Sequence, residues 1–332
     1  NSGILQGSGV VDCPVVNTPN AEIRTSTGDL LQLVDDLDNK GFVDLRGGTL
    51  EVADAIANSG RIALQNAALR VTRLDGATNP LTISSGGRLA ATGGTVDIHA
   101  SVANAAGGTI VVGGESSATF HDPVVNNGVF QVMPGSRALL LHDLSFGAGA
   151  TTNLVLASPA EGPAGPQIEI GGNATLAGAL SVSLASDYQP VAGDAFSLLT
   201  VAGSRTGAFT LSTLPALTSG LAWQIDSSPQ VLALTVVPID PADFNGDRLV
   251  DGADLAVWQI GFGSGSGQSA GDANGDGLVD GGDFLAWQRA AAGASAAAAA
   301  SVPEPIGTTS VLIGVGFVRR LRTSVRRTRT AG

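Results

Sequence analysis

The first half of the chain repeats a pattern in which apolar residues alternate with polar ones, and glycine or asparagine separates the alternating segments. Residues 37–45 and 56–64 both read apolar-x-Asn-x-Gly-x-apolar-x-Leu. Residues 124–132 repeat the pattern with Val at the last position, and looser copies begin near Ile83 and Val102. The repeat period is therefore about 19 to 27 residues.

Alternation at every second position is typical of β-strands that bury one face. A strand this short cannot bury its apolar face alone, whereas stacked turns of a solenoid bury these faces together. Glycine and asparagine at the corners are expected to supply the positive φ angles of sharp bends. Four asparagines are then predicted to form a ladder of stacked side-chain amides: Asn39, Asn58, Asn104 and Asn126. A local helix remains an alternative at Leu30–Leu37, where apolar residues could form one helical face.

Over about residues 30–145 the repeat resembles the right-handed parallel β-helix of pectin lyases and autotransporter passengers. The resemblance rests on periodicity and implies a mainly β fold, with solenoid repeats at residues 1–149. Residues 150–238 contain strand-like runs separated by Gly, Pro and Asn turns. They resemble the β-rich module that closes many bacterial solenoids of this kind and protects the open edge of the stack.

Two acidic loops of twelve residues occur in tandem, at 243–254 and 272–283. Acidic or amide side chains stand at positions 1, 3, 5, 9 and 12, which suits Ca²⁺, a hard ion that takes about six to eight oxygen ligands. Position 7 would contribute its backbone carbonyl. The predicted ligands of the first site are Asp243, Asn245, Asp247, Leu249, Asp251 and Asp254. Those of the second site are Asp272, Asn274, Asp276, Leu278, Asp280 and Asp283.

Each loop is followed by an apolar helical phrase with a Trp four residues after the closing Asp, Trp258 or Trp287. This duplicated loop–helix resembles a type I dockerin, a small α-helical pair of EF-hand-like motifs, at about residues 241–291 within a domain at 239–292. The resemblance implies two Ca²⁺ sites and a cohesin-like partner. Position 6 of the first loop is Arg248 where Gly usually stands, so we expect the first site to be weaker. Positions 10 and 11, which contact cohesin in dockerins, are Gly-Ala and Gly-Gly here, so a calcium-stabilised spacer is the other interpretation.

The C-terminal segment 302–332 contains Pro303-Glu304-Pro305, an apolar run at 306–318 and a cluster of arginines. It follows an Ala/Gly/Ser linker at 293–301. Its order of features resembles the PEP-CTERM sorting signal, which implies export in a Gram-negative-type bacterium, a short apolar helix that inserts transiently into the membrane, and an exosortase-type enzyme as partner. The six arginines at 319–329 carry a charge of +6 in a chain whose net charge is −12. Their position after an apolar run favours a membrane flank over a nucleic-acid site.

Other chemistry is sparse. Cys13 is the sole cysteine, so no internal disulfide is possible. The chain begins at Asn1, and if the protein is exported we expect a signal peptide and further solenoid to lie upstream. His99, His121 and His142 follow strand phrases at nearly the repeat period and could form one surface column, either incidental or able to bind a metal. No convincing catalytic constellation is found.

The sequence thus predicts a non-enzymatic structural or adhesive protein of the cell surface or extracellular matrix. It would consist of a β-solenoid, a calcium-binding dockerin-like module and a sorting tail. The alternative is a component of polysaccharide binding or degradation, docked through the dockerin-like module to a partner.

Overall fold

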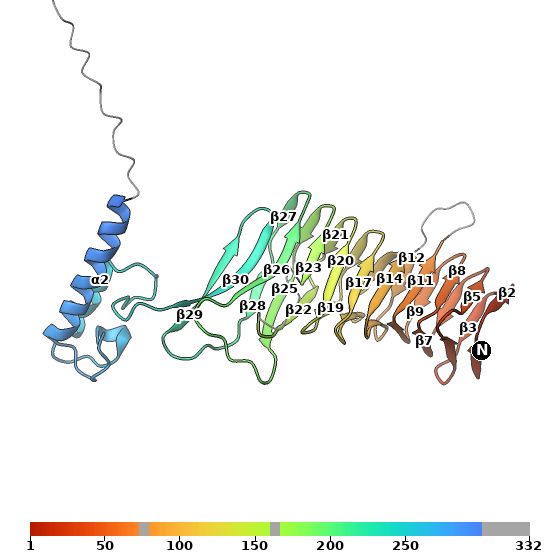
Figure 1. Ribbon diagram of the computed structural model, residues 1–332, viewed down its shortest axis with the longest axis horizontal. Coiled ribbons are helices and arrows are strands. Elements are labelled where there is room, and N and C mark those ends of the chain that lie inside the picture. Colours follow the sequence, from red (N-terminus) through yellow and green to blue (C-terminus); the bar gives the residue numbers. More distant parts are fainter. Residues whose placement is uncertain (73–79, 160–166, 301–332) are drawn as a thin grey trace, which may run out of the picture. The chain divides into compact units, whose positions relative to one another are not determined.

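A computed structural model describes residues 1–72, 80–159 and 167–300 of the chain. The chain divides into two compact units, residues 1–239 and 240–332. The first unit is a parallel β-solenoid whose turns stack side by side from β2 to β26 (Figure 1). This confirms the expected mainly β fold and its parallel solenoid.

Three sheets run the length of the solenoid, and each turn of the chain contributes a strand to each. Sheet A consists, in spatial order, of β1 (Ile4–Gln6), β4 (Glu22–Thr25), β7 (Phe42–Arg46), β10 (Arg61–Gln65), β13 (Arg88–Ala91), β16 (Thr109–Val112), β19 (Val129–Val132), β22 (Thr151–Leu156), β25 (Ala179–Leu184) and β28 (Thr210–Thr213). Sheet B consists of β2 (Gly9–Val11), β5 (Leu30–Leu33), β8 (Thr49–Val52), β11 (Ala67–Val71), β14 (Thr95–His99), β17 (Ser117–Phe120), β20 (Arg137–Leu140), β23 (Ile168–Ile170), β26 (Ala195–Val201), β30 (Val231–Pro238) and β29 (Leu221–Ser227). Sheet C consists of β27 (Arg205–Gly207), β24 (Ala174–Leu176), β21 (Leu144–Phe146), β18 (Val124–Asn126), β15 (Ser101–Asn104), β12 (Pro80–Ile83), β9 (Ile56–Asn58), β6 (Leu37–Asn39) and β3 (Val15–Asn17).

Alternation along each strand decides what is buried. In β14, for example, Val96 and Ile98 point into the solenoid and are buried, whereas Asp97 and His99 are only half-buried. The inward residues of all three sheets form one apolar core that continues from turn to turn. Because neighbouring strands pair in parallel register, apolar side chains of one turn pack on those of the next, which buries a face that no single strand can bury.

Leu30–Leu37 is not helical. Leu30–Leu33 forms β5, with Leu31 and Leu33 buried and Leu30 exposed. The segment pairs in parallel with β2 on one side and β8 on the other. The local helix is therefore excluded, because the two-residue period that the neighbouring turns share is satisfied here as well.

The parallel pairing continues beyond residue 150, where a different module was expected. β22 pairs in parallel with β25, and β25 pairs in parallel with β28 as far as Thr213. One turn of the chain leads from Thr151 to Ala179 and the next from Ala179 to Thr210, and both are longer than the turn from Phe42 to Arg61. The longer corners hide the repeat in the sequence, although the strands still stack.

Among the described strands, antiparallel pairing occurs at the end of sheet B alone. β26 pairs with β30, which pairs with β29, and both pairings are antiparallel. Trp223 of β29 is buried against Phe196, and its indole N–H donates to the carbonyl of Pro215 at 2.8 Å. This hairpin ends the parallel ladder of sheet B and covers part of the apolar core.

A ladder of buried asparagines runs along the ends of the strands of sheet C. The amide Nδ2 of Asn17 donates to Oδ1 of Asn39 at 2.8 Å, and Asn39 donates in the same way to Asn58 at 2.7 Å. Asn104 donates to Asn126 at 2.6 Å. The next turn after Asn58 places Ile83 in register, so the ladder is interrupted there. The sequence predicted four of these asparagines and missed Asn17.

The interruption leaves a buried polar atom without a partner. Within the ladder, the side-chain oxygen of an asparagine accepts from the turn before it, but the residue in register before Asn104 is Ile83, which has no side-chain donor. Accordingly, Oδ1 of Asn104 is buried and has no hydrogen-bond partner in the part of the chain that the structure describes. The ladder is thus directional, with Nδ2 of one turn donating to Oδ1 of the next.

The glycines of the repeat motif allow the backbones of successive turns to approach each other closely. A Cβ added to Gly60 would lie 2.2 Å from the carbonyl oxygen of Gly41, and one added to Gly128 would lie 2.3 Å from that of Gly108. Positive φ angles are found at other corner residues, such as Gly47, Gly107 and Asn66, but not at Gly41, Gly60 and Gly128 of the motif. Glycine is required there because the backbones of successive turns touch.

The second unit contains α1 (Gly252–Gly261), the 3-10 helix η1 (Gln268–Ala270) and α2 (Gly281–Ala300). α2 extends through most of the segment 293–301 that composition had predicted to be a linker. Alanine has the highest helix propensity, so an alanine-rich run can continue a helix that has already begun. The sorting tail predicted at 302–332, with its apolar helix, lies outside the described residues.

The asparagine ladder yields a stability prediction. Asn39→Ala removes the ladder acceptor of one Asn17 N–H and the ladder donor to Asn58 Oδ1, although Asn17 Nδ2 still donates to the Phe42 carbonyl at 3.1 Å. A buried donor or acceptor left unsatisfied costs about 1–3 kcal/mol. We expect urea denaturation followed by circular dichroism to show a loss of at least about 2 kcal/mol. Asp38→Ala, at the neighbouring and partly exposed position, removes only an exposed ion pair with Lys40 and should cost less than about 1 kcal/mol. Equal effects of the two substitutions would contradict a structural role for the ladder.

Candidate metal centre

The two acidic loops of the second unit have the same backbone fold. The carboxylate at position 1, Asp243 or Asp272, accepts hydrogen bonds from the backbone N–H groups three and five residues later, at 2.7–2.9 Å in both loops. These bonds curl each loop around the carboxylate that opens it. Gly246 and Gly275, at position 4, have φ angles of 76° and 74° and take the same left-handed turn.

Positions 3 and 5 also interact in the same way in both loops. In the first loop the Asn245 amide donates to the Asp247 carboxylate at 2.9 Å, and Asn245 Oδ1 accepts from the Asp247 backbone N–H at 2.8 Å. In the second loop Asn274 and Asp276 make the corresponding bonds at 3.1 and 2.8 Å. The side-chain oxygens at positions 1, 3 and 5 are thus oriented by the loop itself.

Position 12 connects each loop to the helix that follows. Asp251 is the N-cap of α1, and its side chain accepts from Ala253 at 2.7 Å. Asp254 completes a capping box and accepts from the backbone N–H groups of Asp251 at 2.8 Å and Phe244 at 2.8 Å. Asp280 and Asp283 make the matching bonds at the start of α2. A carboxylate in the first turn is also favoured by the positive end of the helix dipole.

Positions 1 and 12 bury four carboxylates. The exposed fractions are 4% for Asp243, 0% for Asp254, 4% for Asp272 and 0% for Asp283. Among the described residues, none of the four forms an ion pair with lysine, arginine or histidine. Buried charge is costly unless it is paired or bound to a metal, so two carboxylates in each loop favour a bound cation. The donor set consists of carboxylate and amide oxygens, which fits Ca²⁺.

Backbone N–H groups of the second loop stabilise the ionised form of the Asp272 carboxyl group. Burial alone would raise the pKa of Asp272, but hydrogen bonds from Gly277, Gly275 and Gly267 outweigh it and lower the pKa below its ordinary value. The carboxyl group therefore stays ionised at neutral pH, the form in which it can bind a metal.

Position 6 distinguishes the two loops. Gly277 has a φ of 85°, which glycine adopts freely, whereas Arg248 has a φ of 73° in the same place. A left-handed backbone costs a residue with a Cβ roughly 1–2 kcal/mol. The loops therefore share a fold, but the first carries backbone strain that the second avoids.

The two tryptophans connect each helix of the second unit to the opposite loop by hydrogen bonds. The Trp258 indole N–H donates to the carbonyl of Asp280 at 2.9 Å, and the Trp287 indole donates to that of Asp251 at 2.8 Å. Each helix therefore bonds to position 9 of the opposite loop. The rings also pack between the helices through Phe284, whose ring centroid lies 4.9 Å from that of Trp258 and 5.7 Å from that of Trp287.

The remaining predicted features of the loops are placed as follows. Leu249 and Leu278, expected to offer backbone carbonyls, both expose their side chains. Val250 and Val279, the apolar residues at position 8, do not form strands. Val279 instead accepts a hydrogen bond from the Gly263 backbone N–H at 2.9 Å and is buried.

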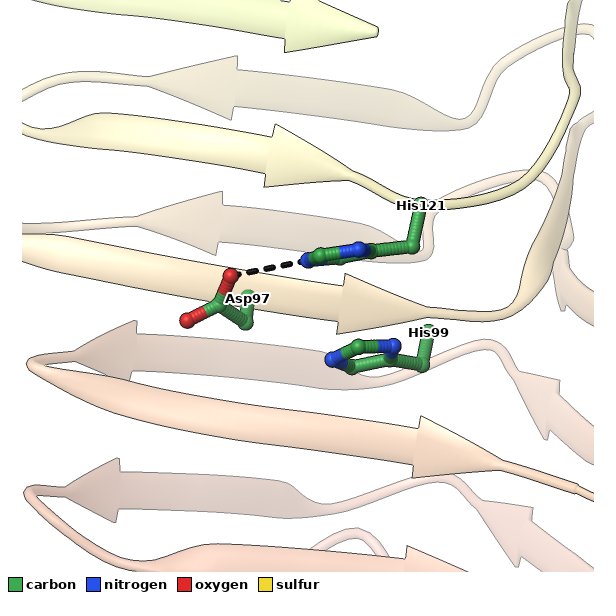
Figure 2. Close-up of side chains that lie close together, drawn as sticks. All are labelled: Asp97, His99 and His121. Atoms are coloured by element: carbon green, nitrogen blue, oxygen red, sulfur yellow. Dashed lines mark hydrogen bonds and ion pairs between the residues drawn. The ribbon is translucent and has the colours of Figure 1, made fainter. Parts of the chain in front are cut away.

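The solenoid carries a second cluster of potential metal ligands. The rings of His99 and His121 are stacked with their centroids 3.7 Å apart, and His121 Nε2 lies 2.9 Å from Oδ1 of Asp97 (Figure 2). His142 does not join this cluster. Phe120 pairs with Leu140, so the residue in register with His121 is Leu141. His142 is one residue further along the chain and is therefore out of register with His121. Sequence reasoning had singled out the histidines but not Asp97, although it stands two residues before His99 on the same face.

No protein-family model matches the chain, and comparison with curated proteins gives no match. Among the described residues, the helices are either too short or too polar to cross a membrane.

Proposed function

We propose that the protein is exported and serves as a structural or adhesive β-solenoid of the cell surface or extracellular matrix, and that its second unit is a dockerin-like module that binds two calcium ions. The observation that carries the calcium proposal is the pair of identically folded loops. Each loop buries two carboxylates that have no basic partner among the described residues. A stacked β-solenoid offers a long, rigid surface, which suits a structural or adhesive role.

Calcium would supply the positive charge that the loops require. In the first loop Asp243, Asn245, Asp247, Asp251 and Asp254 would provide side-chain oxygens directly or through water, and Leu249 its carbonyl. The second loop would use the residues at the same positions: Asp272, Asn274, Asp276, Asp280, Asp283 and Leu278. Since position 12 is also in the first turn of a helix, an ion there would fix the loop to its helix.

The extracellular setting is consistent with such loops. Extracellular calcium modules work at ion affinities of about 10⁻⁴–10⁻³ M, which a strained loop such as the first can still reach. The sorting tail resembles a signal that directs proteins to the surface through an exosortase-type enzyme. Together, the tail and the loops support export more strongly than either does alone.

A docking role for the calcium unit is the second candidate. Ile260 and Phe262, at the end of α1, are 84% and 55% exposed, an unusual position for two large apolar side chains. By contrast, positions 10 and 11 of both loops offer only Gly-Ala and Gly-Gly. A cohesin-like partner or an extracellular polysaccharide would therefore have to be recognised through other residues than those that dockerins use.

Calorimetric titration of the calcium-stripped full chain with Ca²⁺ tests the proposal. Two binding events are expected. Asp272→Asn should abolish the tighter one and Asp243→Asn the weaker one, because each removes a charged oxygen from position 1. Asp226→Asn, an exposed residue of β29, is the control and should leave both events unchanged. A chain that takes up no calcium, or that loses neither event in the two loop variants, would refute the assignment.

Exchanging the residues at position 6 tests the inequality of the loops. Arg248→Gly should strengthen the weaker event by roughly tenfold, since about 1–2 kcal/mol of left-handed strain is relieved. The reciprocal variant Gly277→Arg should weaken the tighter event by a similar factor. If both substitutions shift affinity in the same direction, backbone strain is not the cause of the difference.

Export can be tested in a Gram-negative host that possesses an exosortase, with the same added signal peptide on every variant. The full chain is expected at the cell surface or in the medium, and cleaved near Pro303-Glu304-Pro305. A variant lacking residues 302–329 should remain uncleaved and fail to reach the surface. Mass spectrometry of the fractionated protein measures both outcomes, and surface delivery without the tail would contradict its sorting role.

A further inference from the structure

A cluster on the outer face of sheet B combines three metal-binding side chains. Asp97 and His99 stand two residues apart on β14, and so project from the same face. His121 directly follows β17 and lies in register with His99, because Ile98 pairs with Phe120. Their ligand atoms all lie within 4.8 Å of one another, and all three side chains are half-buried.

We infer that Asp97, His99 and His121 form a surface site for a divalent transition metal of the zinc class, separate from the calcium loops. Two imidazoles and one carboxylate are a donor set that zinc, copper and nickel favour and that calcium disfavours. With bonds of about 2.0–2.2 Å, a tetrahedral ion holds its ligand atoms about 3–4 Å apart. The 2.9 Å between His121 Nε2 and Asp97 Oδ1 is close to this span, and the ligand atoms of all three residues lie within 4.8 Å of one another.

The strands that carry the cluster are rigid, whereas its side chains can adjust. In Figure 2 both rings project in the same direction, and each has a nitrogen on the side of Asp97. The rings are nearly parallel, with 13° between their planes, so a shared ion requires them to turn about their side-chain bonds. The neighbouring Ile98 and Phe120 are buried in the core and fix the backbone beneath the site. The protein thus supplies three ligands and leaves the remaining positions of the ion to solvent or to an added ligand.

Burial, aided by nearby positive charge, favours a neutral His99. Burial lowers the pKa of His99 below its ordinary value, and the nearby His121 ring and Arg70 lower it further, while Asp97 and Asp122 oppose them. A neutral ring keeps a lone pair for a metal at neutral pH. Arg70 is in register with His99 on β11 and exposed, and its charge also repels an incoming cation. The pair of acids, Asp97 and Asp122, offsets this repulsion.

Titration of the full chain with Zn²⁺, in buffer that holds Ca²⁺ in large excess, tests the site. One binding event is expected, and Co²⁺ in place of Zn²⁺ should give visible absorption bands typical of nitrogen ligands. His121→Ala and Asp97→Asn should each weaken this event by at least about tenfold, because each removes one of three ligands. His142→Ala is the matched control, an exposed histidine just outside the cluster, and should leave the affinity unchanged.

A further variant distinguishes a loss of metal binding from a general loss of folding. Arg70→Gln removes a positive charge but no ligand, so it should tighten Zn²⁺ binding several-fold. The inference is overturned if Zn²⁺ does not bind, or if His142→Ala weakens binding as much as His121→Ala does. Calcium binding by the loops should be unaffected in all four variants, so failure of this site and failure of the calcium proposal are distinguishable.

Discussion

Parallel pairing between successive turns is the interaction on which the solenoid depends. Its strands are too short for any one of them to bury its apolar face or satisfy its backbone alone. Pairing solves both problems only if inward residues stay in register from turn to turn, since a slip of one residue would turn the apolar set outward. Variation in length therefore lies mainly at the corners, although the pairing of β25 with β28 contains one extra residue within the strand. Arg61 pairs with Phe42 in the turn before it and with Arg88 in the turn after it, although the second turn is the longer of the two.

The same constraint explains which sequence features predicted the fold. The Asn-x-Gly motif identified the repeat because its asparagine and its glycine both contact a neighbouring turn. The asparagine amide bonds along the ladder, and the glycine lies against the backbone of the preceding turn. Asn17 escaped detection because Pro19 stands where the motif has glycine, although the asparagine still enters the ladder. Ile83 shows the converse, an apolar residue that keeps the register while it breaks the hydrogen-bonded chain and leaves Asn104 Oδ1 without a partner.

Features that depend on register were harder to predict than those that depend on local spacing. The two acidic loops could be described position by position from the sequence, because their candidate ligands come from twelve consecutive residues. The proposed column of three histidines required a count across corners. That count was wrong by one for His142, because β17 and β20 pair Phe120 with Leu140 and so place Leu141 beside His121. The expected change of fold at residue 150 was wrong for a related reason, since lengthened corners conceal a repeat that the backbone continues.

The two candidate metal sites therefore differ in what would destroy them. In the loops, oxygen ligands are oriented by bonds within one segment and by the helix start that Asp254 or Asp283 caps, so the site depends on local closure. In the histidine cluster, ligands from β14 and β17 meet only because His99 and His121 are separated by the same length of chain as Ile98 and Phe120, which are paired. Lengthening or shortening the chain between these two strands by one residue would leave each histidine in its own sequence context and still separate the rings. The cluster thus depends on the register between successive turns, whereas each loop depends only on its own twelve residues and the helix that follows.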